Sequence, residues 1–187
     1  RKQYFENIYP GIEILDKTSN FISNSTHGEV VLKAMREDNR VGIIASSIGM
    51  ETELNGEKID TVVPTLKDYQ NALNRFSPNQ KVKVFSQSWG VPKKIGDFSV
   101  GNNAIANIAP GGNQAEGQKI FDFYKEQVNK DVLFVWANGN TLNGVTFNDA
   151  YFQAGLPYLY SELEKGWITV VGVKKKQENT LNVHYNP

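Results

Sequence analysis

The chain has 187 residues, and its 20 Lys and Arg residues balance its 20 Asp and Glu residues, for a formal net charge of +0. This length suits a single domain, 1–187, and a neutral chain lacks the basic surface that holds a nucleic acid backbone, so nucleic acid is not an expected partner. The absence of cysteine excludes disulfides, thiolate metal sites and a cysteine nucleophile.

Short apolar runs alternate with helical patterns along the chain. Runs rich in β-branched and aromatic residues predict buried strands at Val41–Ser46, Val82–Phe85, Val132–Trp136 and Trp167–Val173. Helical patterns lie at Gly28–Arg36, Leu66–Phe76 and Ala115–Val128. The Gly- and Asn-rich stretch 101–117 is expected to be a loop inside the domain. The alternation predicts an α/β fold, doubly wound, with a mostly parallel sheet and helices on both faces.

Three of the predicted strands end in small, polar residues. Ser46-Ser47 follow the first, Ser86-Gln87-Ser88 the second and Asn138-Gly139-Asn140 the third. Active sites of parallel α/β sheets collect at the carboxyl ends of the strands. We therefore expect a functional site at the edge of the sheet where these segments emerge.

His27 is the first candidate catalytic residue. Thr26-His27-Gly28-Glu29 has the form of a capping box, which places His27 in the first turn of a helix. The positive end of the helix dipole disfavours the imidazolium there, and a neutral ring is the state that a general base needs. The alternative is an ordinary exposed residue of a first helical turn, and these residues alone favour it.

Two further segments have both a functional and a plain structural interpretation. Ser88-Trp89-Gly90 leaves backbone groups free where an extended peptide can add as a further strand, or it is a simple strand terminus with a glycine turn. Asn138-Gly139-Asn140 suits a tight turn with positive φ, or it presents a side-chain amide to an oxyanion. Taken singly, both segments favour the plain interpretation.

Together, in this order, these segments resemble the core of the subtilisin-like serine proteases, the subtilases of peptidase S8 type. Blocks of that family are similar to His27-Gly28, to Ser86–Gly90 and to Ala137–Asn140, and a later family strand resembles Trp167–Val173. Leu156–Val173 is similar to the same part of the subtilase passenger domains of bacterial autotransporters. The resemblance therefore implies a subtilisin-like fold and a secreted or bacterial cell-surface protein.

The resemblance also implies a serine endopeptidase that hydrolyses peptide bonds through a Ser-His-Asp triad, with a peptide or protein substrate. His27 takes the place of the catalytic histidine and Asn140 that of the oxyanion asparagine. Ser88, Trp89 and Gly90 are expected to pair with the substrate backbone and, with Asn138 and Gly139, to wall the first specificity pocket, although Trp89 also suits simple core packing. We expect no cofactor and no metal.

The chain departs from the family pattern at both outer members of the triad. Glu29 and Val30 replace the Thr-His that follows the catalytic His-Gly, and Asp16 suits a turn or core edge better than the catalytic position. The Gly-Thr-Ser-x-Ala-x-Pro motif of the nucleophile does not occur in residues 1–187. Ser46, Ser47, Ser86 and Ser88 all precede Asn140, which is the wrong side for a subtilase nucleophile.

These departures suggest an internal section of a longer protease, the central part of its catalytic domain without the first (Asp) and last (Ser) segments. Such a fragment has an incomplete sheet and should be inactive alone, and the missing segments of the same protease, as separate chains, are then candidate partners. The alternative is a non-catalytic subtilase-like domain that binds peptides or serves as a structural module.

Overall fold

The computed structural model describes residues 12–15, 34–35, 43–46, 50–54, 57–61, 63–74, 83–139, 149–175 and 181–183. They belong to two compact units, one formed by Arg1–Ile48 with Lys67–Gln80 and the other by Gly49–Leu66 with Lys81–Pro187. Of the helices within these ranges, none combines the length and apolar character that crossing a membrane requires.

In the first unit, strands β1 (Ile12–Leu15) and β2 (Ile43–Ser46) pair in parallel. Strand β2 confirms the last four residues of the run predicted at Val41–Ser46. Helix α3 (Leu66–Leu73), most of which belongs to this unit, begins where predicted and ends before Phe76. Of the helix predicted at Gly28–Arg36, only residues 34 and 35 are described, and both are helical.

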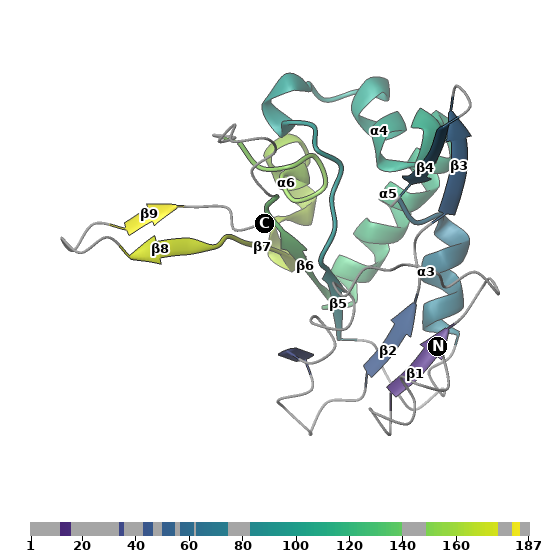
Figure 1. Cartoon of the computed structure of the whole chain (residues 1–187), viewed down its shortest axis with the longest axis horizontal. Coiled ribbons are helices and arrows are strands. Elements are labelled where there is room, and N and C mark those ends of the chain that lie inside the picture. The colour runs from purple at the N-terminus through teal and green to yellow at the C-terminus, as the bar shows by residue number, and fades with distance from the viewer. Residues whose placement is uncertain are drawn as a thin grey trace. The chain divides into compact units, whose positions relative to one another are not determined.

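The second unit contains a parallel sheet in the order β5 (Val84–Gln87), β6 (Leu133–Ala137), β7 (Trp167–Val170) (Figure 1). All three strands were predicted, with boundaries that differ by up to three residues. Two antiparallel pairs, β3 (Met50–Leu54) with β4 (Glu57–Thr61) and β8 (Val173–Lys175) with β9 (Leu181–Val183), are additional. The α/β class and the mostly parallel sheet are confirmed.

Helix α5 (Gln114–Asn129) covers one face of this sheet. It begins after Asn113, whose side-chain oxygen accepts a hydrogen bond from the Glu116 amide at 2.9 Å and so caps the first turn. Its apolar side chains Ile120, Phe121, Tyr124 and Val128 are buried. The ring of Tyr124 lies 5.1 Å from Phe134 on β6 and 5.3 Å from Trp167 on β7, between ring centroids.

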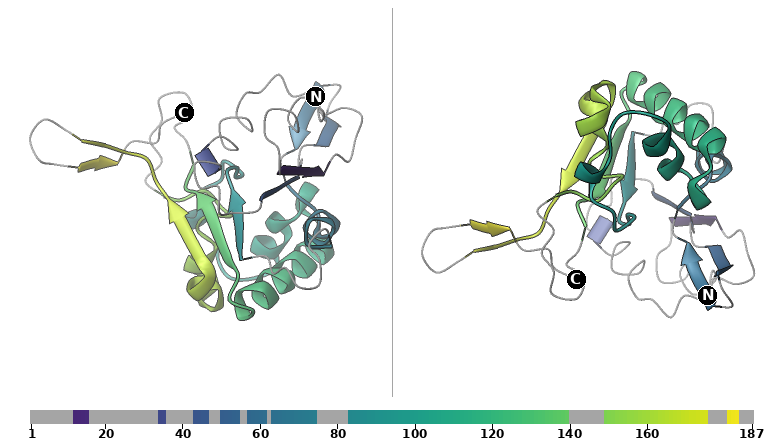
Figure 2. Two further views of the ribbon diagram at one scale, coloured as in Figure 1. Left: turned by 90° about the horizontal axis from the view of Figure 1, so that it is seen from below. Right: turned by 90° about the horizontal axis from the view of Figure 1, so that it is seen from above.

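The stretch 101–117, predicted as a loop, is largely helical, and that prediction is wrong. Helix α4 (Asn102–Ile108) is followed by the short turn η2 (Pro110–Gly112) and then by the start of α5. Ala104, Ile105 and Ile108 share one face of α4 and are buried. Burial of this face against α5 outweighs the poor helix propensity of the glycines and asparagines around it. Figure 2 shows α4 and α5 on the same side of the sheet.

The opposite face of the sheet is apolar and partly open. Val84, Ile168 and Val170 alternate along their strands with the covered side chains and are 49%, 44% and 53% exposed. The segments that lead into β7, α6 (Leu156–Leu159) and η3 (Ser161–Gly166), pack on the α5 side, where the rings of Phe121 and Tyr160 lie 4.6 Å apart. The second helical layer of a doubly wound sheet is thus not among the described helices of this unit.

Gly117→Ala is expected to lower the free energy of unfolding by about 1–3 kcal/mol, although alanine favours a helix over glycine by about 1 kcal/mol. A Cβ atom at residue 117 would lie 2.0 Å from the backbone oxygen of Ile105 on α4. Urea denaturation followed by circular dichroism measures the change. Gln118→Ala, at an exposed position of the same helix, is the control and should stay within about 0.5 kcal/mol. A gain in stability for Gly117→Ala would contradict the close crossing of α4 and α5.

Candidate functional site

The ends of β5 and β6 lie side by side at one rim of the sheet. Gln87 and Trp136 are register partners in the parallel pair, so Ser88–Gly90 and Asn138–Gly139 leave the two strands at neighbouring points. The amide of Asn138 donates to the carbonyl of Val170 at 2.9 Å, which extends the pairing with β7 past the end of β6. The structure therefore brings together the two segments that the sequence assigned to substrate binding.

Trp89 packs into the aromatic core. Its ring lies edge-on to that of Trp136, with centroids 5.1 Å apart, and Trp136 stacks on Trp167 at 5.2 Å. The indole Nε1 of Trp89 donates to Oε1 of the buried Gln87. These contacts favour core packing, the alternative given for Trp89 from the sequence, and any contact between this residue and a substrate stays a prediction.

Gly139 has a φ of +123°, as the tight-turn interpretation of Asn138–Asn140 predicts. It also lies directly against an aromatic ring, since a Cβ atom at residue 139 would be 2.4 Å from Cδ1 of Tyr151. A Cβ atom at Gly90 would be 3.1 Å from Cδ2 of the same ring. Tyr151 therefore has one edge of its ring toward each of these two glycines.

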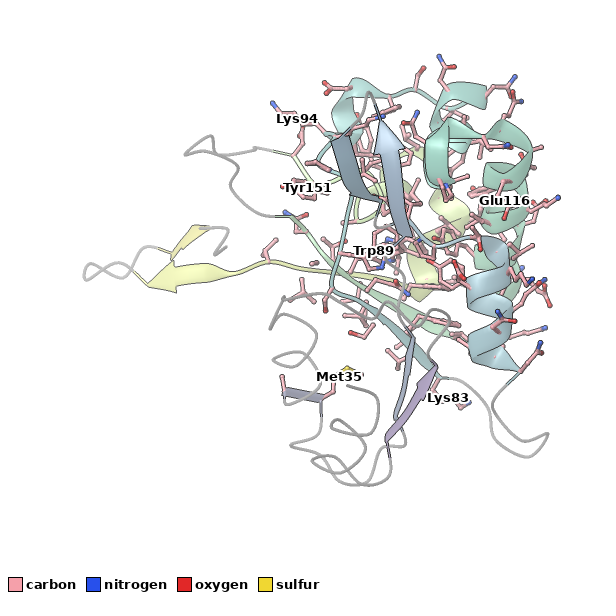
Figure 3. The ribbon with its side chains drawn as sticks, turned by 45° about the vertical axis from the view of Figure 1, so that its right-hand side comes forward. Met35, Lys83, Trp89, Lys94, Glu116 and Tyr151 are labelled. Carbon is pink, nitrogen blue, oxygen red and sulfur yellow. The ribbon has the colours of Figure 1, made fainter. Side chains whose placement is uncertain are left out.

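Residues 150–155, here called the buried strap, form hydrogen bonds with Asn138 and with the chain that follows Ser88–Gly90. The amide of Tyr151 donates to the carbonyl of Asn138 at 2.9 Å, and the amide of Ile95 donates to the carbonyl of Ala150 at 3.0 Å. Tyr151 also forms an isolated antiparallel bridge with Lys94, beside it in Figure 3. The strap thus links the end of β6 to the chain that follows β5.

Gln153 is the most deeply buried polar side chain of the strap, with 0% exposure. Its side-chain Oε1 accepts from the amide of Val91 at 2.9 Å, and its backbone carbonyl accepts from Nε1 of Trp167 at 3.2 Å. Sequence reasoning did not find the strap. The only signal was a short aromatic run, Tyr151-Phe152, ahead of a Gly-Leu-Pro turn, and nothing in that run distinguishes it from ordinary core.

The described site segments carry no formal charge. Ser88–Gly90, Asn138–Gly139 and the buried strap contain no Asp, Glu, Lys, Arg or His. Ion pairs such as Lys125–Glu162, at 3.7 Å, join exposed side chains of α5 and η3. The polar groups of these segments are therefore backbone amides and carbonyls and uncharged side chains.

Both predicted catalytic residues, His27 and Asn140, lie outside the described residues, as does Asp16. Asn140 directly follows Gly139, the last described residue of its segment. Within the described ranges, no group of three or more His, Asp or Glu side chains is placed to hold a metal ion. Because these ranges exclude both histidines, the expectation of no metal site stays a prediction.

A family model described as the Subtilase family, Peptidase_S8, matches residues 28–183. The matched range includes the rim segments, the buried strap and position 140, and it begins one residue after His27. No curated protein matches the chain.

Gly139→Ala is expected to lower the free energy of unfolding by about 1–3 kcal/mol more than the control Gly101→Ala. Both glycines have a φ that L residues rarely adopt, +123° and +144°, but a Cβ atom at residue 101 meets nothing within 4 Å, so the control measures backbone strain alone. The double variant Gly139→Ala/Tyr151→Ala should lose less stability than the sum of the losses of the two single variants, with a coupling of about 0.5–3 kcal/mol. Chemical denaturation of the wild type, the two single variants and the double variant measures this cycle, and zero coupling would mean that the ring does not lie on Gly139.

Proposed function

The chain belongs to the subtilase family of serine peptidases, and we propose that it carries the histidine and the oxyanion asparagine of a serine endopeptidase acting through a Ser-His-Asp triad. The observation that carries the proposal is the in-register parallel pairing of β5 with β6. It brings Ser88–Gly90 and Asn138–Gly139 to one rim, at the carboxyl ends of the strands, where α/β enzymes bind their substrates.

In the proposed reaction, a serine hydroxyl attacks the peptide carbonyl while His27 takes its proton. His27 then passes that proton to the leaving amine, and water repeats the sequence on the acyl-enzyme. We propose that the serine and the aspartate come from segments outside residues 1–187, in the same chain or as separate chains. This agrees with the absence of the nucleophile motif from these residues.

We further propose that the Asn140 side chain donates a hydrogen bond to the oxyanion as the carbonyl becomes tetrahedral. Two described features support this role. The amide and carbonyl of Asn138 are both held by backbone hydrogen bonds, and Gly139 adopts a positive φ that turns the chain immediately before residue 140. A preorganised oxyanion donor needs a fixed backbone beside it, and these bonds fix the chain as far as Gly139.

The substrate is proposed to be an extended peptide that pairs with the backbone of Ser88–Gly90. The uncharged character of the described site segments suits a main-chain ligand. A secreted or bacterial cell-surface location, of the autotransporter type, is a further proposal. It rests on the resemblance of Leu156–Val173, which forms α6, η3, β7 and the start of β8.

His27→Ala should abolish both peptide cleavage and labelling by a serine-directed phosphonate in the full-length protease that carries this chain, because no base then activates the serine. The chain's other histidine offers a matched control, and His184→Ala should leave both unchanged. Mass spectrometry of the labelled protein and a fluorogenic peptide assay give the two readouts. Labelling that persists in His27→Ala would remove His27 from the mechanism.

Asn140→Ala should reduce kcat by about 10² to 10³ with little change in KM, since the lost hydrogen bond forms mainly in the transition state. This magnitude is known from subtilisin itself and is taken over from the family. Asn138→Ala, two residues away, is the comparison and should affect stability more than kcat, because Asn138 is buried. Equal losses of kcat and thermal stability in both variants would argue against an oxyanion role. A full-length protein without any phosphonate labelling would instead support the peptide-binding alternative.

A further inference from the structure

Tyr151 lies between the two segments proposed to wall the first specificity pocket. Its Cδ2 edge faces Gly90, where a Cβ atom would lie at 3.1 Å, and its Cδ1 edge faces Gly139, where a Cβ atom would lie at 2.4 Å. The ring therefore takes up space that the missing side chains of these glycines leave open. A substrate side chain entering between the same two segments would meet this ring.

The position of Tyr151 is set by its backbone. Its amide donates to the carbonyl of Asn138 and its carbonyl accepts from the amide of Gly155, both at 2.9 Å. The bridge to Lys94 adds a third connection, and the residue is only 7% exposed. Figure 3 shows Tyr151 next to Lys94. A ring fixed at several backbone points does not move aside at low cost, so it limits the volume available to a ligand.

We propose that Tyr151 determines specificity by filling the first specificity pocket, so that the chain accepts peptides with a small residue, such as Gly, Ala or Ser, at the position before the scissile bond. This proposal rests on the proposed function, because the pocket is defined by the substrate segments given there. A phenylalanine or leucine at that position would have to displace the ring or lose its burial between Gly90 and Gly139.

A purely structural role for Tyr151 predicts a different result. Removal of a buried ring that only packs would lower stability without changing which peptides bind. A ring that fills a binding space leaves a cavity of its own shape when it is removed, and that cavity should accept an aromatic side chain from the ligand. Ligand preference, and not stability, therefore separates the two roles.

The test measures peptide binding to the full 187-residue chain by isothermal titration calorimetry. Two acetylated tetrapeptides are compared that differ only in their C-terminal residue, alanine or phenylalanine. The wild type should bind the alanine peptide about tenfold or more tightly than the phenylalanine peptide, a usual discrimination for a pocket of fixed size. Tyr151→Ala should reverse this preference, and Tyr151→Phe, which keeps the ring, should retain it.

Tyr158→Ala is the matched control, because Tyr158 is 77% exposed and should leave the preference of the wild type unchanged. If Tyr151→Ala does not fold, as judged by circular dichroism, Tyr151→Leu takes its place and should weaken the wild-type preference for the alanine peptide. Equal or tighter wild-type binding of the phenylalanine peptide, or no binding of either peptide, overturns the proposal. Binding of the alanine peptide by a full-length protein that resists phosphonate labelling would overturn the peptidase function and leave the role of Tyr151 standing.

Discussion

Two hydrogen bonds of Gln153 connect the chain after β5, the buried strap and the start of β7. The side-chain Oε1 of Gln153 accepts from the amide of Val91 and so anchors the chain after β5 to the strap. The backbone carbonyl of Gln153 accepts from Nε1 of Trp167 at the start of β7. A buried amide is stable only when its polar atoms are paired, and loss of one partner costs about 1–3 kcal/mol. The position of Tyr151, two residues earlier, depends on this attachment.

Beneath the rim, a continuous aromatic core packs across the three hydrogen-bonded strands. Phe85, Phe134 and Trp167 are register partners on β5, β6 and β7, and the first two stack with centroids 5.0 Å apart. Offset and edge contacts of this kind contribute beyond the area that they bury. Glycines let other elements approach this core closely, since a Cβ atom at Gly166 would lie 2.6 Å from a methyl carbon of Val128 on α5. The site segments therefore extend from a densely packed base, which limits how far they can shift.

Patterns with a strong local cause were predictable from the sequence, and features that depend on tertiary contact were not. Continuous apolar runs predicted β5, β6 and β7, and the 3.6-residue period predicted α5, because burial acts directly on these patterns. Helix α4 was missed because its apolar face is short and lies among glycines and asparagines. The β3–β4 pair had a recognisable signal that was overlooked, Asn55-Gly56 between two alternating runs. For the site, the motifs predicted which strand ends meet, but Tyr151 depends on a loop fold that no local pattern encodes.

The lack of charge in the described site segments has a kinetic consequence. A cleft lined with one sign of charge draws its ligand in and loses that advantage as ionic strength rises. Ser88–Gly90, Asn138–Gly139 and the buried strap offer no such attraction. For the proposed peptide substrate, these segments add no electrostatic attraction of their own, and any steering comes from charged neighbours such as Lys94. Salt should then change the on-rate of that peptide only through charged residues outside these segments.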